Sequence, residues 1–450
     1  MSELSTIDRN APSVARGNNG VCEMAAQSSR LSRRSILKAA GAGAALAAGG
    51  ASAFAAPGRV VAQAGGKITF WVISPFTPDE NAPIYAAAKQ YQEANGVEVA
   101  IEPTAPPDML NKLITAVRGG GGPDVVSVDS AWNATLGAAQ ILSDVTERFA
   151  PIADQFFEGP AGTGKYLDVQ YAVPWYTNNV ALFYNTKLFE AAGIDGPPAT
   201  WDELVDKGTK LTSGDTYGLM LGGGGFGSFQ FWPFAWQNGA TLISEDGKQA
   251  EFGSDAGLEA WQFYSDLYLN HKIVPEDVKS AGESWDQVFA PFIQERAAMV
   301  MAGDWAIGAF KDGNPDLQFS VAPLPKGKEA ATVIGGYNLG IPATAPNADE
   351  AWKFIEWLTA QEQETILQGY NRIQARADIL DTEYATKDPL IKVFIDQSAV
   401  GRARATVPAW DEIENTVMSD AWDSVLLGEA TPADALADAV EQTNDLLAEE

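Results

Sequence analysis

Three β-rich runs alternate with two helical patterns in the early part of the chain. The runs are KITFWVIS (67–74), VEVAIEP (97–103) and PDVVSVD (123–129), and the residues between them carry apolar side chains at helical spacing. This order is typical of a parallel sheet that helices cover on both faces. Ligands of such sheets bind at the carboxyl ends of the strands, which fall here at Ser74 and Asp129. The alternation therefore predicts an α/β fold with a binding site at that edge.

Signals later in the chain predict further helices and turns. Thr200-Trp201-Asp202-Glu203 has the pattern of a capping box, in which the threonine accepts a hydrogen bond from the first turn and the glutamate reaches back. The glycine run 222–225 predicts a turn, so the aromatic residues that follow it are expected in a turn-rich segment. Helical spacing of apolar residues recurs over 255–270, 283–294, 348–368 and 432–447.

The first 64 residues have the features of an export signal. A twin arginine, Arg33-Arg34, precedes an alanine- and glycine-rich run, and small-residue cleavage sites end at Ala55 and Ala64. A helix that spans a bilayer needs roughly 20 mostly apolar residues, whereas this run is short and interrupted by glycine. The residues around Arg33-Arg34 resemble a twin-arginine export signal. We therefore expect residues 1–64 to be a leader that engages the twin-arginine export machinery and directs the protein to the periplasm or the outer face of the cytoplasmic membrane.

The composition of the remaining chain excludes several classes of function. Without residues 1–64, 386 residues remain, with 23 basic and 56 acidic side chains and a net charge of −33. That length suffices for two domains, because single cores stop growing at roughly 250–300 residues. A surface so acidic repels nucleic acid and anionic lipid, so we expect no nucleic-acid partner. The only cysteine is Cys22, in the leader, so no disulfide, thiol chemistry or lipid-bound cysteine is expected after it.

Few residues are available for catalysis. His271 is the only histidine, which argues against zinc hydrolysis and Ser-His-Asp catalysis. The segment 159–166 resembles a phosphate loop, but Tyr166 occupies the place of the Ser or Thr that would bind magnesium, and we interpret the segment as a hairpin turn. A carboxylate pair for glycoside hydrolysis stays open among so many acidic residues. We expect no metal, no cofactor and no catalytic residue.

One long stretch carries a resemblance to a known family. Residues 171–204, YAVPWYTNNVALFYNTKLFEAAGIDGPPATWDEL, resemble a signature of the solute-binding proteins of ATP-driven sugar importers, the maltose-binding-protein-like family. Further pieces follow in family order, including GPDVV (122–126), GDW (303–305) and AWKFIEWL (351–358). Each piece is weak alone, and together they are specific. The resemblance covers essentially all of residues 66–450.

The resemblance implies a fold and a function. The fold is two-lobed and hinge-linked, of the type II periplasmic-binding-protein kind, with the ligand cleft between the lobes. The function is to capture a sugar, oligosaccharide or polyol and deliver it to the membrane permease subunits of an ABC transporter. The predicted N-terminal lobe is 66–174 plus 322–370 and the C-terminal lobe is 180–320 plus 376–450, with crossings near 174–180, 319–323 and 370–376.

Sugar sites combine aromatic platforms with hydrogen-bonding groups, because a sugar has apolar C–H faces and a rim of hydroxyls. Tryptophans in helical patterns are expected in the core, whereas the platform candidates follow strands or lie in turn-rich segments. Those candidates are Trp132, Trp175, Tyr176, Trp232, Trp236, Trp305 and Trp410, of which Trp305 and Trp410 match ligand-contacting aromatics of the family. The other candidates are Ser74, Asp129, Asp304, Tyr337, Asn338 and Arg376.

Four alternatives stay open at this point. Arg376 either binds the ligand or braces the third crossing. The pair Gly335-Gly336, expected in a loop at a strand end, either lets a ligand approach the backbone or only serves a turn. The ligand could instead be glycerol 3-phosphate or a phosphodiester, held by Arg372 and Arg376, and a secreted glycoside-acting enzyme is a further alternative.

The export signal yields a first prediction. Arg33→Lys combined with Arg34→Lys is expected to retain the protein in the cytoplasm, because the twin arginine is the feature that identifies the signal. Immunoblotting of cytoplasmic and exported fractions measures this. Unchanged export of the double variant would refute the twin-arginine assignment.

Overall fold

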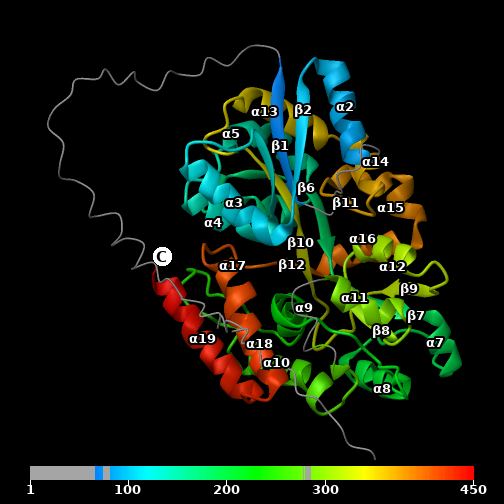
Figure 1. Ribbon diagram of the computed structural model, residues 1–450. Coiled ribbons are helices and arrows are strands. Elements are labelled where there is room, and N and C mark those ends of the chain that lie inside the picture. The colour runs from blue at the N-terminus through cyan, green and yellow to red at the C-terminus, as the bar shows by residue number, and fades with distance from the viewer. Residues whose placement is uncertain (1–65, 74–81, 277, 279–284, 450) are drawn as a thin grey trace, which may run out of the picture. The chain divides into compact units, whose positions relative to one another are not determined.

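The computed structural model describes residues 66–73, 82–276, 278 and 285–449, which lie in one structural unit of the chain (Figure 1). The predicted leader and the candidate Ser74 lie outside these ranges. Within them, no helix has both the length and the apolar character that crossing a membrane requires.

The largest sheet joins strands from distant parts of the chain. Its first three strands are parallel neighbours, as the alternation predicted, and the central strand β10 runs antiparallel to both of its long neighbours. The strand order is β11-β6-β10-β3-β1-β2, and β12 pairs with β10. The bounds are β1 (Lys67–Ile73), β2 (Glu98–Thr104), β3 (Val125–Asp129), β6 (Ala172–Asn179), β10 (Thr332–Gly340), β11 (Ile373–Gln374) and β12 (Gly401–Ala403).

Helices α2 (Pro83–Asn95), α3 (Pro106–Arg118) and α13 (Ala348–Leu358) accompany this sheet (Figure 1). Both of the first two begin with proline, which suits the first helical turn because its N–H would be unpaired there. Phe354 of α13 makes edge contacts with Phe70 of β1 and Tyr91 of α2, at ring distances of 5.6 and 5.0 Å. These aromatic side chains form the core on one face of the sheet.

A second, antiparallel sheet has the order β8-β7-β9. Its strands are β7 (Ala181–Asn185), β8 (Met299–Ala302) and β9 (Phe319–Ala322). The helices in this part of the chain are α7 (Thr186–Ala191), α8 (Trp201–Leu211), α9 (Gly224–Gln237), α10 (Asp255–Leu269), α11 (Trp285–Ile293), α12 (Ala306–Gly313), α16 (Pro389–Gln397), α18 (Met418–Leu427) and α19 (Pro432–Ala448). The predicted capping box is present: Thr200 accepts from the Glu203 N–H, while the Glu203 carboxylate accepts from the N–H of Ala199.

Short elements connect the two sheets and complete the chain. They are η1 (Ser130–Trp132), α4 (Asn133–Ala138), α5 (Thr146–Phe149), η2 (Ala150–Gln155), α6 (Glu158–Thr163), β4 (Lys165–Tyr166), β5 (Val169–Gln170), η4 (Gln361–Gln363), α14 (Glu364–Gln368), η5 (Ala377–Asp381), α15 (Glu383–Lys387), η6 (Ser398–Val400), α17 (Trp410–Glu412) and η7 (Ile413–Val417). The segment that resembles a phosphate loop is therefore split between α6 and the β4–β5 hairpin, which matches the predicted hairpin only in its second half.

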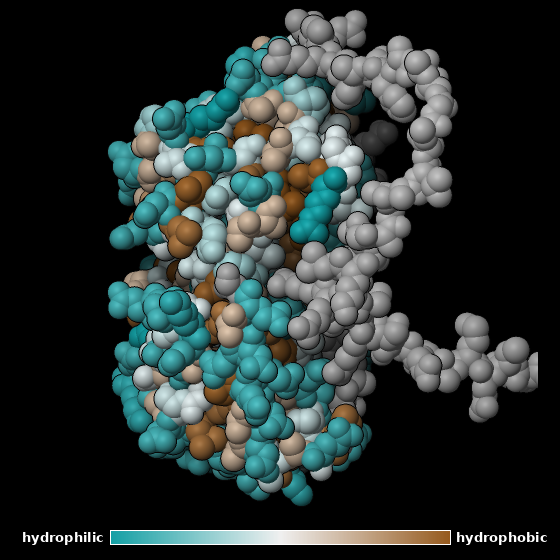
Figure 2. Space-filling model, turned by 90° about the vertical axis from the view of Figure 1, so that its left-hand side faces the viewer, coloured by the Kyte–Doolittle hydropathy of each residue, from teal (hydrophilic) through white to brown (hydrophobic). Residues whose placement is uncertain are grey.

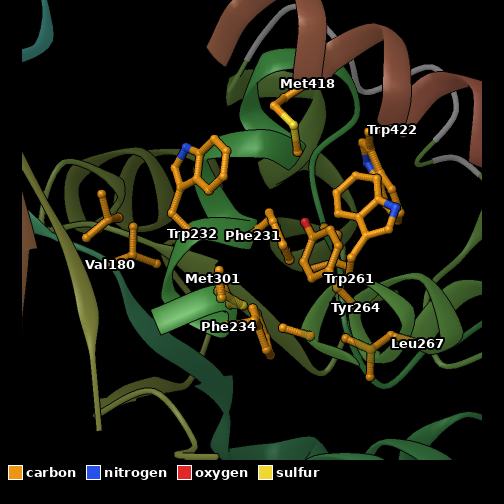
Figure 3. Close-up of a cluster of buried hydrophobic side chains, with 14 of the residues drawn as sticks. Val180, Phe231, Trp232, Phe234, Trp261, Tyr264, Leu267, Met301, Met418 and Trp422 are labelled. Atoms are coloured by element: carbon orange, nitrogen blue, oxygen red, sulfur yellow. The ribbon is translucent and has the colours of Figure 1, made fainter. Parts of the chain in front are cut away.

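The core beside the second sheet is rich in aromatic side chains. Trp232, Trp261 and Trp422 are fully buried there, and Figure 3 shows them together with Phe231 and Tyr264. Trp422 also donates from Nε1 to the carbonyl of Gly222, at 2.9 Å. A layer of rings from three helices therefore stabilises this part of the chain.

The expectation of a turn-rich segment after the glycine run 222–225 is wrong. Helix α9 begins at Gly224 and carries Trp232 and Trp236. A Cβ on Gly227 would stand 2.3 Å from the indole of Trp422, so small residues at the start of α9 permit the close approach of α18. Tertiary packing here outweighs the low helix propensity of glycine.

The hydrophobic cores fall into two groups, and long strands pass between them. Along β6, Tyr176 packs with the first-sheet core and Val180, just after the strand, packs with the second. Along β10, Val333 packs with the second core and Leu339 with the first, while Leu324 still belongs to the second. These packing contacts favour a second crossing along β10 in place of the predicted segment 319–323, and its position stays a proposal.

The third crossing between the two groups of cores lies near β11. Ile373 packs with the core of the second sheet and Ala375 with the core of the first, which falls within the predicted segment 370–376. The exact lobe boundaries stay a proposal, in which the second crossing moves from 319–323 to β10.

The exposed surface is mostly polar. Figure 2 shows hydrophilic side chains over much of the visible face, with separate hydrophobic patches between them. Of the large hydrophobic side chains among the described residues, Leu167 in the β4–β5 hairpin and Leu427 at the end of α18 are the most exposed. Such scattered apolar residues are ordinary on a protein surface.

An ion triad, in which two side chains are buried and that of Asp129 is partly buried, joins the first sheet to the C-terminal segment. Arg404, just after β12, places Nη2 at 2.5 Å from Oδ1 of Asp129 and Nη1 at 2.8 Å from Oε2 of Glu414. We call these three residues the Arg404 clasp. Burial lowers the pKa of Arg404, but the two carboxylates raise it by more, so the guanidinium stays charged.

Two hydrogen bonds run beside the Arg404 clasp. Nε1 of Trp132 donates to Oδ1 of Asp411 at 2.8 Å, and the hydroxyl of Thr135 donates to the carbonyl of Pro408 at 2.7 Å. The segment from Arg404 to Glu414 is therefore held against the end of β3 by both charge and hydrogen bonds.

The clasp predicts a large stability effect. Arg404→Met is expected to lower the free energy of unfolding by about 3–5 kcal/mol, because it leaves the buried carboxylate of Glu414 and the partly buried carboxylate of Asp129 without a counter-charge. The deficit should shrink as the pH falls, since burial already raises the pKa of Glu414 and protonation removes its charge. Urea denaturation at several pH values measures both effects.

A matched control lies two residues earlier. Arg402 pairs with Glu329 on the surface, where both side chains are about half exposed. Arg402→Met is therefore expected to change stability by less than about 1 kcal/mol. Equal effects of the two substitutions would contradict the role assigned to the clasp.

Candidate functional site

Four of the aromatic candidates are packed inside hydrophobic cores. Trp175 lies against Phe70, with ring centroids 6.1 Å apart. Trp232 and Trp410 are fully buried with their rings 5.3 Å apart, and Trp236 belongs to the same core. These contacts indicate that the four residues stabilise the hydrophobic cores. A ligand contact for these four residues stays a prediction that no contact in the structure supports.

Trp305 differs from these four because its side chain is only partly buried. The lack of a partner for its Nε1 is shared with Nε1 of Trp410. It follows β8, where the family resemblance places a ligand aromatic, and its ring lies 5.3 Å from Trp285 and 6.4 Å from Phe229. The side chain is only partly buried, yet its Nε1 is shielded from solvent and has no hydrogen-bond acceptor. An indole N–H that is buried normally donates to a partner, so this site is incomplete as it stands.

Asp304, the residue before Trp305, is fully buried and carries two unpartnered oxygens. The nearest cation is Arg372, whose Nη1 lies 3.7 Å from Oδ1, too far for a hydrogen bond. Nε and Nη1 of Arg372 also lack acceptors. We call Asp304, Trp305 and Arg372 the Asp304–Arg372 site.

The electrostatics of this site are unusual for a carboxylate. Burial raises the pKa of Asp304 to about 7, although Arg372 and the backbone N–H groups of Trp305 and Ile373 lower it. Both N–H groups therefore lie close enough to the carboxylate to favour its charged form. Burial outweighs them, so this carboxyl group holds its proton more readily than an ordinary aspartate.

Tyr176 and Tyr337 connect the Asp304–Arg372 site to the Arg404 clasp. They are paired across β6 and β10 with ring centroids 5.2 Å apart, and the guanidinium of Arg372 lies over the ring of Tyr176. Burial raises the pKa of Tyr337, Asp129 raises it further, and Arg372 and Arg404 lower it. Charged groups of both clusters therefore shift the pKa of Tyr337, which lies between the two clusters.

The expected loop around Gly335 and Gly336 is part of β10 instead. Gly336 has φ +126°, and a Cβ there would stand 2.2 Å from the carbonyl oxygen of Tyr176. Glycine is therefore needed for the close approach of β6 and for the register shift that follows at Tyr337 and Asn338. Asn338 is buried and donates to the hydroxyl of Thr163 at 3.1 Å.

Arg376 has the contacts of a bracing residue. It donates to both carboxylate oxygens of Asp378, at 3.0 and 2.6 Å, and to Oε1 of Gln155 at 2.9 Å. Its third acceptor is the carbonyl of Thr359, at 3.4 Å. The structure therefore favours the bracing alternative, and ligand binding by Arg376 stays a prediction.

The structure thus brings together only part of the predicted set. Asp304, Trp305, Tyr176 and Tyr337 are neighbours, and Asp129 and Trp132 lie at the clasp. The sequence analysis missed Arg404, Glu414, Asp411 and Tyr384, and it weighed Arg372 only as a phosphate ligand. The scarcity of arginine in an acidic chain is a signal that could have identified Arg404.

The shifted pKa predicts how stability depends on pH. The folded state binds the Asp304 proton more tightly than the unfolded state, whose carboxyl pKa is 3.8. The stabilisation from this proton is therefore complete below pH 3.8 and is lost as the pH rises through about 7. Asp304→Asn cannot titrate, so wild type should lose up to roughly 4 kcal/mol relative to the variant between pH 4 and 8. Chemical denaturation across this range measures the difference, and a constant difference would contradict the assignment.

Comparisons with known proteins identify the family of the chain. A profile described as bacterial extracellular solute-binding protein matches residues 77–365. A maltotriose-binding protein from Pyrococcus abyssi is 27% identical over 350 residues, which covers 73% of this chain and 71% of that protein. An sn-glycerol-3-phosphate-binding periplasmic protein from Pectobacterium atrosepticum is 26% identical over 376 residues, covering 74% and 80%.

A solved structure is similar over nearly the whole described chain. It is an ABC transporter solute-binding protein from Thermotoga lettingae bound with alpha-D-tagatose, with a TM-score of 0.77 and 29% identity over 85% of this chain and all of that one. The likeness confirms the predicted two-lobed α/β fold. The chain belongs to the bacterial extracellular solute-binding proteins.

Proposed function

We propose that this protein captures a sugar, oligosaccharide or polyol outside the cytoplasm and delivers it, unchanged, to the permease of an ABC transporter. The family and the named relatives support this proposal, since both maltotriose and tagatose are ligands of similar proteins. The single observation in the structure that supports the proposed function is the arrangement at the Asp304–Arg372 site. An indole ring lies there beside buried donors and acceptors that have no partner among the residues that the structure describes.

This arrangement suits a sugar in two ways. The indole of Trp305 offers an apolar surface for C–H groups. The free donors of Arg372 and the free acceptors of Asp304 can satisfy ring hydroxyls, which both donate and accept. Binding without turnover is part of the proposal, because the relatives are binding proteins and the sequence offers no nucleophile with an activating histidine nearby.

The route out of the cytoplasm is also part of the proposal. The twin arginine supports export through the twin-arginine machinery, and the permease subunits of an ABC transporter are the partner that receives the ligand. A second candidate ligand is glycerol 3-phosphate, favoured by one relative that binds it.

Trp305 provides the test. A sugar face on indole buries about 60–100 Å², worth roughly 1.5–2.5 kcal/mol at about 25 cal/mol per Å². Trp305→Ala is therefore expected to weaken sugar binding about 10- to 70-fold while changing the melting temperature little. Calorimetric titration and thermal melting of the same protein measure both quantities.

Trp422→Ala is the matched control. Trp422 is fully buried and touches only the protein core, so its truncation should cost about 3–5 kcal/mol of stability and leave the affinity of the folded protein unchanged. If Trp305→Ala behaved like Trp422→Ala, Trp305 would be a packing residue and the proposed site would be wrong. Native mass spectrometry of protein purified from its own cells identifies the solute that stays bound.

A further inference from the structure

We propose that residues 404–411 form a latch that keeps the two groups of cores in contact when no solute is bound. The segment makes three polar contacts that cross from one group of cores to the other. This inference goes beyond the proposed function, because it concerns how the protein opens and closes. Only its effect on the rates of solute exchange rests on the proposed function.

The need for opening follows from burial. Asp304 is fully buried and Arg372 is only 6% exposed, so a solute cannot reach the Asp304–Arg372 site in the described state. Exchange of a solute there requires the two groups of cores to separate. Strands β6 and β10 pass between the groups, and they are the connections about which such a movement can turn. Any contact that breaks during the separation controls how often the protein opens.

The residues that face the latch lie at the end of β3 and just after it. Asp129 ends β3, and Trp132 and Leu136 pack with Val128 of that strand. Thr135 lies on α4, directly before Leu136. The partners of Asp129, Trp132 and Thr135 are Nη2 of Arg404, Oδ1 of Asp411 and the carbonyl of Pro408, at 2.5, 2.8 and 2.7 Å.

The latch itself is anchored in the cores beside the second sheet. Trp410 is buried in the same core as Trp232, whose Nε1 donates to Oε1 of Glu414 at 2.8 Å. Arg404 also bonds Glu414, so it keeps one carboxylate when its contact with Asp129 breaks. The latch therefore belongs to one group of cores, and its three crossing contacts reach the other.

The crossing contacts have the chemistry of a reversible attachment. Each of them is polar, and four of the participating residues are partly exposed, namely Asp129, Thr135, Pro408 and Asp411. Water can replace each bond when the surfaces separate, so the net contribution of one hydrogen bond is modest. Loss of one neutral bond is expected to shift the closing equilibrium by about 2- to 12-fold.

A latch has a distinctive effect on solute binding. The three contacts do not involve Asp304 or Arg372, so we expect them in the closed protein both with and without solute. An interaction that is equal in two states does not change the affinity that separates them. Loss of a crossing contact increases both the open population that a solute enters and the frequency with which a bound solute escapes. Association and dissociation therefore both become faster, while the dissociation constant changes little.

The first test measures the distance across the latch in the full chain. Spin labels at Thr115→Cys on α3 and Asp438→Cys on α19 report it, because both positions are exposed and the helices lie on opposite sides of the latch (Figure 1). Cys22→Ser removes the only natural cysteine. Double electron–electron resonance on dialysed, solute-free protein is expected to show a main population at short distance. Trp132→Phe combined with Thr135→Val deletes two crossing bonds and should enlarge the long-distance population at least about fivefold.

The second test measures the rates of solute exchange. Stopped-flow tryptophan fluorescence with D-tagatose, maltose and maltotriose gives the association and dissociation rates of each probe that binds. Thr135→Val is expected to raise both rates about 2- to 12-fold and to leave the dissociation constant within about twofold. This substitution keeps the shape of the side chain, so it also repeats the distance test if the double variant folds poorly.

Thr359→Val is the matched control. The hydroxyl of Thr359 donates to the carbonyl of Ile355 at 2.8 Å, at the end of α13 and away from the latch. The substitution therefore deletes a comparable hydrogen bond that does not cross between the groups of cores. It should change neither the exchange rates nor the measured distances.

Each outcome supports or overturns the latch. A main population at long distance in solute-free wild type, or equal distances in wild type and the latch variants, would show that residues 404–411 do not hold the protein closed. A changed dissociation constant in Thr135→Val without faster exchange in both directions would place Thr135 at the solute site and overturn the inference. If no probe binds and no solute copurifies, the proposed function fails, whereas the distances still decide this inference.

Discussion

The pairing of β6 with β10 is the constraint on which the rest of the structure depends. These two strands run side by side from one group of cores to the other, and their register places Tyr176 opposite Tyr337. The pairing is possible because Gly336 has no side chain at the point where the two backbones meet most closely. Tyr176 and Tyr337 lie on these strands, and Arg372 directly precedes β11, which pairs with β6. A bulkier residue at Gly336 would therefore disturb the site and both groups of cores at once.

Buried charge is handled in two contrasting ways around this strand pair. In the Arg404 clasp, one arginine bonds two carboxylates at hydrogen-bond distance, so the charges stabilise each other. In the Asp304–Arg372 site, the two charges stand 3.7 Å apart, and both carboxylate oxygens of Asp304 and Nε and Nη1 of Arg372 have no hydrogen-bond partner among the described residues. In the clasp, Nη1 and Nη2 of Arg404 both bond carboxylates and Nε has no partner, so the clasp is the more complete of the two arrangements. This contrast is the physical basis for assigning a structural role to one cluster and a ligand to the other.

The tryptophans illustrate how far local sequence reasoning extends. The helical spacing around Trp261 correctly predicted a core residue, since spacing reports which face of a helix is buried. Trp232 and Trp236 were expected in a turn-rich segment because glycines precede them, yet they lie on α9. Glycine has low helix propensity, and only the approach of Trp422 explains why it is used there. Propensity is a local property, whereas this contact joins residues about 200 positions apart.

The sequence by itself determined the α/β class, the order of the first strands and helices, the cap at Thr200 and the family resemblance. These properties follow from short-range periodicity, local hydrogen bonds and matched strings of residues. Only the tertiary structure decided that Arg372 faces Asp304, that Arg404 joins Asp129 to Glu414, and that β6 pairs with β10 in a register that sets Tyr176 opposite Tyr337. The partners in each ion pair are at least 68 positions apart, except Arg404 and Glu414. Such pairings depend on how distant segments pack, because burial and charge compensation are set by the whole fold and not by neighbours in the chain.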